Sequence, residues 1–189
     1  GIPIKLMNEG RSDDFKKNFA ITHFFNPPRY LNLFEVIPGP DCDENVLNFL
    51  MDYGQKFLGK TSVLAKDTPA FIGNRIGTFG IQSLFHQVKN GELSVEEVDK
   101  LTGTAIGRPK SATFRTADVV GLDTLCHVAT GIYDNCPEDE SRNIFKLPDF
   151  LKKMLDKKML GSKTKQGFYK KVVGSDGKSK ILSLDLKTF

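Results

Sequence analysis

The sequence predicts an α/β region followed by a mostly helical region. In residues 1–66, short apolar runs rich in Phe, Ile, Leu and Val alternate with a helical pattern, as in α/β folds. In residues 67–189, the apolar residues recur mainly at helical spacing. A glycine-rich turn at 174–177 lies between two further short runs, as in a β-hairpin. We therefore place the boundary near Lys66 and Asp67.

Two neighbouring strands are predicted in the first region. The segments 19–25 and 31–37 carry the β-branched and aromatic residues that strands favour. Pro27 and Pro28 separate them, because proline has no N–H to donate to a β-ladder. A hairpin that turns at Arg29 would pair the two strands and set position 23 opposite position 35.

The first region continues with a helix and a third strand. Asp43 is a suitable N-cap, and Gly59 stands where the C-cap of this helix is expected. The third strand is predicted over 61–65. The helix has one apolar face, formed by Val46, Leu47, Phe49, Leu50, Tyr53 and Phe57.

The second region is predicted to consist of helices and a terminal hairpin. Its first helix spans 71–88 and ends near Asn90-Gly91. Ser94 then begins a second helix, with Glu97 three residues later as in a capping box. Two more helices are expected over 115–133, interrupted at Gly121, and over 149–159. The two strands of the hairpin are expected over 167–171 and 180–184.

Composition and charge narrow the class of function. Hydrophobic residues make up 39% and charged residues 26% of the 189 residues, and no apolar run approaches the roughly 18 residues of a membrane span. The net charge is +4, with many lysines after residue 150, which indicates either attraction to an anionic partner or an ordinary solvated surface. Aromatic residues do not alternate with these lysines, so nucleic acid is not an expected partner.

The cysteines favour a reducing compartment and no metal site. Cys42, Cys126 and Cys136 are odd in number, and no His or Cys cluster has the spacing of a metal site. Cys126 stands beside His127, but neighbouring residues of a helix point about 100° apart, so a nucleophilic pair is disfavoured. We interpret His86 and His127 as structural.

An acid/base pair is predicted from the pairing of the first two strands. In that register the Cβ atoms of His23 and Glu35 lie about 5 Å apart. A carboxylate at this distance can accept a hydrogen bond from one imidazole nitrogen and make the other nitrogen more basic. Such a pair is suited to moving a proton to and from an alcohol. The spacing alone also fits a histidine and a glutamate that only satisfy each other.

Two asparagines are further candidates for ligand binding. Asn74 would lie one turn into the helix whose first turn contains Pro69, where its side chain can hydrogen-bond a carbonyl or a hydroxyl. Asn26 follows a strand, and loops after strands face the ligand crevice in α/β folds. Each also fits a simpler interpretation, Asn74 as an exposed helical residue and Asn26 as a turn former.

Five short segments occur in an order that carries a resemblance to a known family. They are His-Phe-Phe-Asn-Pro at 23–27, Glu-Val-Ile at 35–37, Lys-Asp-Thr-Pro-Ala-Phe-Ile-Gly-Asn-Arg at 66–75, Gly-Leu-Asp at 121–123, and Gly-x-Lys-Thr-x-x-Gly-Phe-Tyr at 161–169. Together they resemble the 3-hydroxyacyl-CoA dehydrogenase family of fatty-acid β-oxidation. One departure is Ala70, where the family usually has glycine.

The resemblance implies a fold, roles and partners. Residues 1–66 would be the C-terminal part of a Rossmann-type NAD-binding domain, and residues 67–189 a helical domain that binds acyl-CoA and forms a homodimer. His23 would take the C3 hydroxyl proton while C3 gives hydride to NAD, and Glu35 would orient the imidazole. Asn74 and Asn26 would contact the substrate.

The cofactor site is not evident in the sequence. Gly-x-Gly-x-x-Gly, the dinucleotide-binding loop, is absent. We therefore expect a fragment without the N-terminal NAD-binding part, inactive by itself because little would hold the pyrophosphate. A bacterial cytoplasmic location is expected, with the mitochondrial matrix or the peroxisome left open. The alternatives are a non-catalytic acyl-CoA-docking or dimerisation module of a larger multifunctional protein, and a related dehydrogenase of hydroxy acids or sugar acids.

Overall fold

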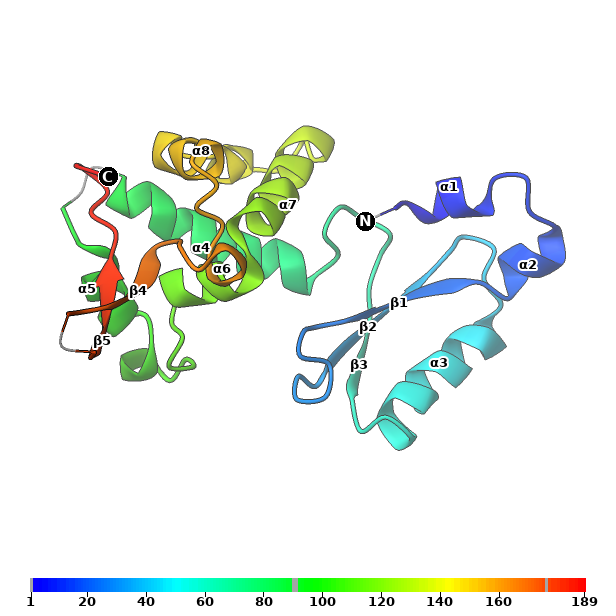
Figure 1. Cartoon of the computed structure of the whole chain (residues 1–189). Helices are drawn as coiled ribbons and strands as arrows, with labels where there is room; N and C mark the ends of the chain where they lie inside the picture. The colour runs from blue at the N-terminus through cyan, green and yellow to red at the C-terminus, as the bar shows by residue number, and fades with distance from the viewer. Residues whose placement is uncertain (1, 90–91, 176) are drawn as a thin grey trace. The chain divides into compact units, whose positions relative to one another are not determined.

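The computed structural model describes residues 2–89, 92–175 and 177–189 (Figure 1). The chain divides into two compact units, Gly1–Arg75 and Ile76–Phe189. The first unit is α/β, and the second is mainly helical with a hairpin at its end, as the sequence predicts. The predicted helix end at Asn90-Gly91 and position 176 of the predicted hairpin turn lie outside the described residues.

The first unit contains a three-stranded sheet. Strand β1 (Ala20–Phe24) pairs antiparallel with β2 (Leu33–Pro38), and β2 pairs parallel with β3 (Thr61–Leu64). The order β1-β2-β3 makes β2 the central strand, and four of its residues in a row are buried. His23 faces Glu35 across the β1–β2 ladder. The register that the sequence predicted for this hairpin is therefore confirmed.

Two short helices precede this sheet. They are α1 (Ile4–Asn8) and α2 (Asp13–Lys17), and both lie near its strands in Figure 1. The fully buried Ile4 packs with Ile37 of β2 and with Ala65, which follows β3. The backbone N–H of Ile4 also donates to the Asp67 carboxylate at 2.8 Å. Helix α1 is thus fixed to the end of the sheet.

Helix α3 (Glu44–Lys56) connects β2 to β3 and begins where predicted, because the Asp43 side chain accepts the N–H of Asn45 at 2.8 Å. Gly54 of this helix is buried, and a Cβ there would lie 2.6 Å from the Phe34 ring. The predicted apolar face is only partly buried. Phe49 and Phe57 are 61% and 75% exposed. The helix thus packs on the sheet through Gly54, and its large rings at Phe49 and Phe57 remain exposed.

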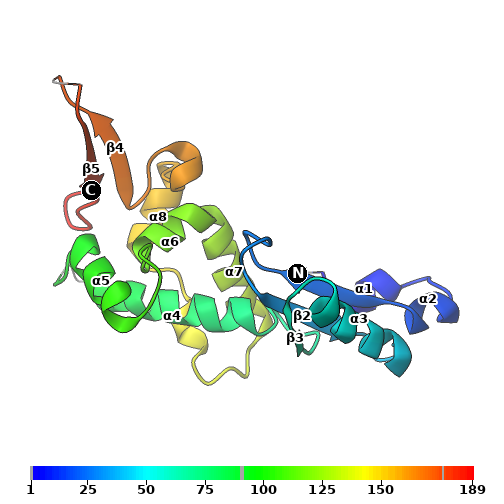
Figure 2. The ribbon, with the colours of Figure 1, turned by 90° about the horizontal axis from the view of Figure 1, so that it is seen from below.

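The second unit combines helices with a small hairpin. Gly121, at φ +95°, ends one helix before the next begins, so the predicted interrupted helix is in fact two helices. Figure 2 shows the hairpin projecting away from the helices. The elements are α4 (Gly73–Val88), α5 (Val95–Leu101), α6 (Phe114–Val120), α7 (Leu122–Asn135), α8 (Asp149–Asp156), β4 (Tyr169–Val173) and β5 (Ser179–Ser183).

Four phenylalanine rings form the centre of the second unit. Phe85 of α4 lies 5.2 Å from Phe114 of α6, and Phe114 lies 4.6 Å from Phe168, between ring centroids. Phe150 of α8 completes the group at 5.8 Å from Phe85. Three of these rings are fully buried, so each contributes about 1.5–3 kcal/mol by leaving water.

A buried carboxylate joins the glycine-rich segment 161–169 to α6. Asp118 is 5% exposed and accepts the backbone N–H groups of Phe168 and Tyr169, both at 2.9 Å. A Cβ on Gly167 would lie 2.6 Å from the Asp118 carboxyl carbon, so only glycine fits there. Burial raises the pKa of Asp118, although the two N–H groups act in the opposite direction. The glycines of this segment therefore follow from packing against Asp118.

Candidate active site

Strands β1 and β2 bring the predicted acid/base pair together. His23 Nδ1 lies 2.6 Å from Glu35 Oε2. The Glu35 side chain is fully buried, while 27% of the His23 side chain is exposed. The carboxylate engages Nδ1, so Nε2 is the nitrogen that can exchange a proton with a ligand.

The second oxygen of Glu35 binds the start of α4. Oε1 accepts the backbone N–H of Ile72 at 2.9 Å and that of Gly73 at 2.8 Å. The first N–H groups of a helix have no partner within the helix, so a carboxylate there satisfies them. Glu35 therefore joins β2, His23 and α4. No local pattern in the sequence signals this contact, because its partners lie 37 and 38 residues further along the chain.

The start of α4 differs from the prediction. The helix begins at Gly73, and Ala70 and Phe71 before it have φ values of +64° and +50°. Asn74 is consequently the second residue of the helix and is half-buried, whereas the sequence placed it one turn in. Pro69 could not reveal this, because it fits a turn as well as a first helical turn. Asn26 is exposed and lies two residues after the end of β1 at Phe24.

Two aromatic rings surround the imidazole of His23. The Phe25 ring lies 4.7 Å from it, between centroids, at an angle of 64°. The Phe71 ring lies 5.6 Å away at 60°. Sequence reasoning missed both contacts, although Phe25 and Phe71 stand within the segments 23–27 and 66–75 that it singled out. Phenylalanine in such segments is equally typical of an ordinary core.

We expect that replacing Ala70 with glycine raises the free energy of unfolding by up to about 1.6 kcal/mol. A left-handed φ costs an L-residue about 1–2 kcal/mol, and the greater freedom of unfolded glycine offsets about 0.4–1 kcal/mol of that. Urea unfolding followed by circular dichroism measures the difference. The matched control is the reverse change, Gly59→Ala at φ +61° in open space. It should destabilise the protein, and a clear loss of stability in the Ala70→Gly variant would contradict the interpretation.

Other reactive side chains have structural surroundings. Burial raises the pKa of Cys126 to about 12, so its thiol stays protonated at neutral pH. His86 Nε2 lies 3.0 Å from the carbonyl oxygens of both Ile144 and Lys146. Within residues 2–89, 92–175 and 177–189, no three His, Cys, Asp or Glu side chains are grouped to hold a metal ion. None of the helices described is both long and apolar enough to cross a bilayer.

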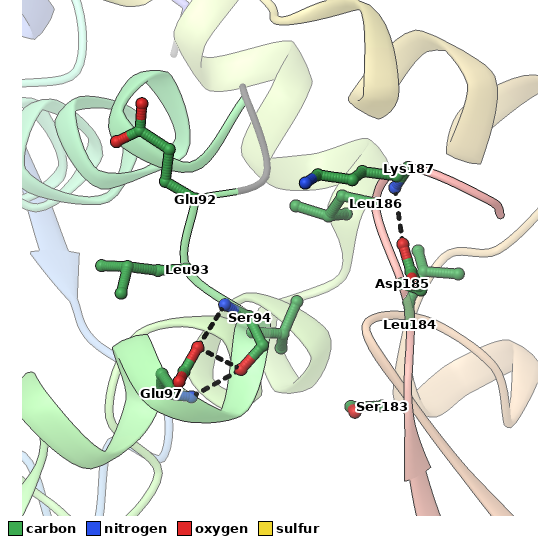
Figure 3. A pocket seen from close by; sticks show the side chains of 10 residues that line it. Glu92, Leu93, Ser94, Glu97, Ser183, Leu184, Asp185, Leu186 and Lys187 are labelled. Carbon is green, nitrogen blue, oxygen red and sulfur yellow. Dashed lines mark hydrogen bonds between the residues drawn. The ribbon is translucent and has the colours of Figure 1, made fainter.

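A hollow in the second unit has a volume of about 370 Å³ and is lined by the start of α5 and by residues 183–187 (Figure 3). Its polar groups are bonded locally. The backbone N–H and hydroxyl of Ser94 donate to Glu97, which lowers the pKa of that carboxyl. The N–H groups of Lys187 and Thr188 donate to the Asp185 carboxylate and lower its pKa as well. The lining contains none of the predicted site residues, so we do not regard it as the active site.

Two family models match the chain. Residues 1–68 match the NAD-binding domain of 3-hydroxyacyl-CoA dehydrogenase, and residues 71–171 match the C-terminal domain of the same family. The expectation that the NAD-binding part lies outside this chain is therefore wrong. That expectation took the absence of the phosphate-binding loop as the absence of the whole NAD-binding domain. The matched residues 1–68 nevertheless contain β1, β2, α3 and β3.

Individual relatives agree with the family models. A "Probable 3-hydroxyacyl-CoA dehydrogenase" of Bacillus subtilis is 54% identical over 90% of this chain and 22% of its own length. One of Deinococcus radiodurans is 48% identical over 90% of this chain and 49% of its own. The crystal structure of M. tuberculosis FadB2 superimposes with a TM-score of 0.80 at 28% identity, over 89% of this chain and 57% of that one. The chain thus spans less than two thirds of each protein, and it belongs to the 3-hydroxyacyl-CoA dehydrogenase family.

Proposed function

We propose that this chain takes part in the NAD-dependent oxidation of 3-hydroxyacyl-CoA to 3-oxoacyl-CoA, with His23 as the acid/base. The observation that carries the proposal is the 2.6 Å contact between His23 Nδ1 and the fully buried Glu35. A buried carboxylate bound to one imidazole nitrogen fixes the tautomer and leaves the other nitrogen able to accept a proton. Part of the imidazole is exposed, as a group that meets a ligand must be.

Proton transfer follows from this arrangement. Nε2 of His23 takes the proton of the C3 hydroxyl group, and the imidazolium that forms is stabilised by the charge of Glu35. In the reverse direction Nε2 returns the proton to the developing alkoxide. NAD supplies the hydride acceptor when it is bound. The contribution of this chain is the geometry of the base relative to the hydroxyl group.

The two asparagines are proposed to bind the substrate. Asn74 directly follows Gly73, whose N–H donates to Glu35, so the asparagine side chain starts from a backbone fixed to the acid/base pair. Asn26 directly follows Phe25, whose ring contacts His23. We propose that Asn74 bonds the thioester or hydroxyl oxygen and that Asn26 lines the same site. Residues 67–189 would bind the acyl chain and form a homodimer, and residues 1–66 would belong to the NAD-binding domain.

The described helix starts of the first unit do not fit the pyrophosphate of NAD. Side-chain oxygens already accept backbone N–H groups at each of them. Glu35 does so at α4, Asp43 at α3 and Asp67 at α1, and these three are carboxylates that would repel phosphate. Ser12 caps α2, which begins with two aspartates. We therefore assign no contact between these helix starts and the pyrophosphate, and we expect this chain by itself to bind NAD weakly.

The test is NADH oxidation with acetoacetyl-CoA, measured by absorbance on the 189-residue chain. We expect turnover that is slow and keeps rising with NADH into the millimolar range, because weak cofactor binding limits it. Free acetoacetate is the control substrate. It should be reduced far more slowly, since a CoA-specific site loses the binding energy of the CoA moiety. Equal rates with both substrates would favour a dehydrogenase of simple hydroxy acids instead.

A further inference from the structure

We propose that Phe25, Phe71 and Gly73 are positioning residues that fix the plane of the His23 imidazole. The inference rests on the proposed acid/base role of His23. These three residues contact His23 or Glu35, so they would act through the base and not on the reacting atoms.

The hydrogen bond to Glu35 alone does not fix the plane of the imidazole. The ring can still rock about its Cβ–Cγ bond while the hydrogen bond bends, and this motion moves Nε2, the atom that exchanges the proton. The Phe25 and Phe71 rings meet the imidazole at 64° and 60°, at centroid distances of 4.7 and 5.6 Å. These are edge-to-face contacts, which aromatic groups favour and which resist a tilt. Together the carboxylate and the two rings define the direction of Nε2.

Gly73 makes the Phe25 contact possible. A Cβ at position 73 would lie 2.5 Å from Cζ and 2.9 Å from Cε1 of the Phe25 ring, and 3.1 Å from a methyl group of Leu33. The Phe25 ring therefore packs directly against the backbone of Gly73, where a side chain would not fit. The N–H of the same residue donates to Glu35 at 2.8 Å. Gly73 thus supports the imidazole twice, through the carboxylate on one side and through the Phe25 ring on the other.

Phe71 is placed by a strained turn. Its φ of +50° is rare for a bulky L-residue. The turn is closed by the Phe71 N–H, which donates to the Thr68 carbonyl at 3.0 Å. Straightening it would remove the Phe71 ring from His23 and also the N–H of Ile72 from Glu35. Strain that is retained next to a reactive group is typical of sites where geometry is needed.

The decisive variant is Gly73→Ala, studied by nitrogen–proton NMR of the imidazole groups in the full chain. The protein has three histidines, so the His23 signals can be assigned by comparison with a His23→Gln variant. We expect the wild-type ring to be the Nδ1–H tautomer and its signals to move in the Gly73→Ala variant. The matched control is Gly77→Ala in the same helix, where an added Cβ meets open space. The His23 signals should not change in this control.

A second variant separates positioning from stability. Leucine lacks the Cε1 and Cζ atoms that an alanine at position 73 would strike, so Phe25→Leu should restore the thermal stability that Gly73→Ala removes. The His23 signals should nevertheless stay displaced in the double variant, because the Phe25 ring is gone. In the acetoacetyl-CoA assay, each of the three variants should lower kcat by about 10–100-fold, the range that a misplacement of about 1 Å produces. KM should stay within a factor of about two if binding is untouched.

The outcomes distinguish the two proposals. Wild-type His23 signals in both single variants would overturn the positioning role. Signals that recover together with stability in the double variant would also overturn it, since they would indicate a purely structural effect. Displaced signals combined with no turnover, even in the wild-type chain at millimolar NADH, would contradict the proposed function and leave the positioning role intact.

Discussion

Replacing His23 with glutamine is expected to lower kcat for acetoacetyl-CoA reduction by about 10²–10⁴-fold, the usual contribution of a general acid or base. Glutamine can still hydrogen-bond Glu35, but it cannot carry a proton between a hydroxyl group and solvent at neutral pH. The fold should remain, because the imidazole is partly exposed and its main partner keeps a hydrogen-bonding group. The measurement is NADH oxidation at saturating acetoacetyl-CoA, with circular dichroism spectra to confirm folding.

The control for His23 is His127→Gln. His127 is exposed on α7 and is not one of the proposed site residues, so its replacement should leave the rate within a factor of about two of the wild type. An unchanged rate in the His23→Gln variant would refute the acid/base role. It would then favour the alternative of a non-catalytic acyl-CoA-docking or dimerisation module.

Replacing Asp118 with alanine should lower the free energy of unfolding by at least about 1–3 kcal/mol, the cost of one buried N–H group left without a partner. That group is the N–H of Phe168, and the partly buried N–H of Tyr169 loses its acceptor as well. Asp123→Ala is the control. Asp123 pairs with Lys163 at 2.5 Å on the surface, and such a pair contributes at most about 1 kcal/mol. Urea unfolding measures both, and equal losses would contradict the proposed role of the buried carboxylate.

Asp118 also predicts a dependence of stability on pH. Burial raises its pKa in the folded state above the ordinary 3.8, so the folded chain binds this proton more tightly than the unfolded chain does. Its contribution to stability is therefore fully present below the unfolded pKa and is lost as the pH rises through the folded pKa. The side-chain amide of an Asp118→Asn variant cannot titrate, so subtracting the stability of this variant from that of the wild type at each pH isolates the contribution. We expect the difference to shrink as the pH rises, and a difference that grows would contradict the shift.

Sequence patterns predicted the local features of the site better than its long-range ones. The pairing of His23 with Glu35 followed from strand pattern and from the two prolines, because a hairpin register depends on residues close in the chain. The contacts from Glu35 to Ile72 and Gly73 could not be predicted, since they depend on how β2 and the start of α4 meet in space. The left-handed backbone conformation of Ala70 and Phe71 could not be predicted either, because neither alanine nor phenylalanine favours a positive φ.

The face of α3 shows a second limit of sequence patterns. Helical periodicity correctly found the apolar residues Phe49, Tyr53 and Phe57, but it could not tell a buried face from an exposed one. Gly54 decides the outcome, because it lets the helix approach Phe34 and Ser62 and thereby turns the large rings toward solvent. A glycine inside an apolar helix pattern therefore indicates which side of the helix faces the sheet better than the large apolar residues do.

The double attachment of Glu35 has a consequence for evolution. A gene copy that drifts away from catalysis loses selection on His23, but it still needs a carboxylate at position 35 to begin α4. Glu35 should therefore persist in inactive descendants, and its presence in a homologue is weak evidence of an active enzyme. The diagnostic position in a genome survey is His23, because folding places little demand on that residue beyond its bond to Glu35.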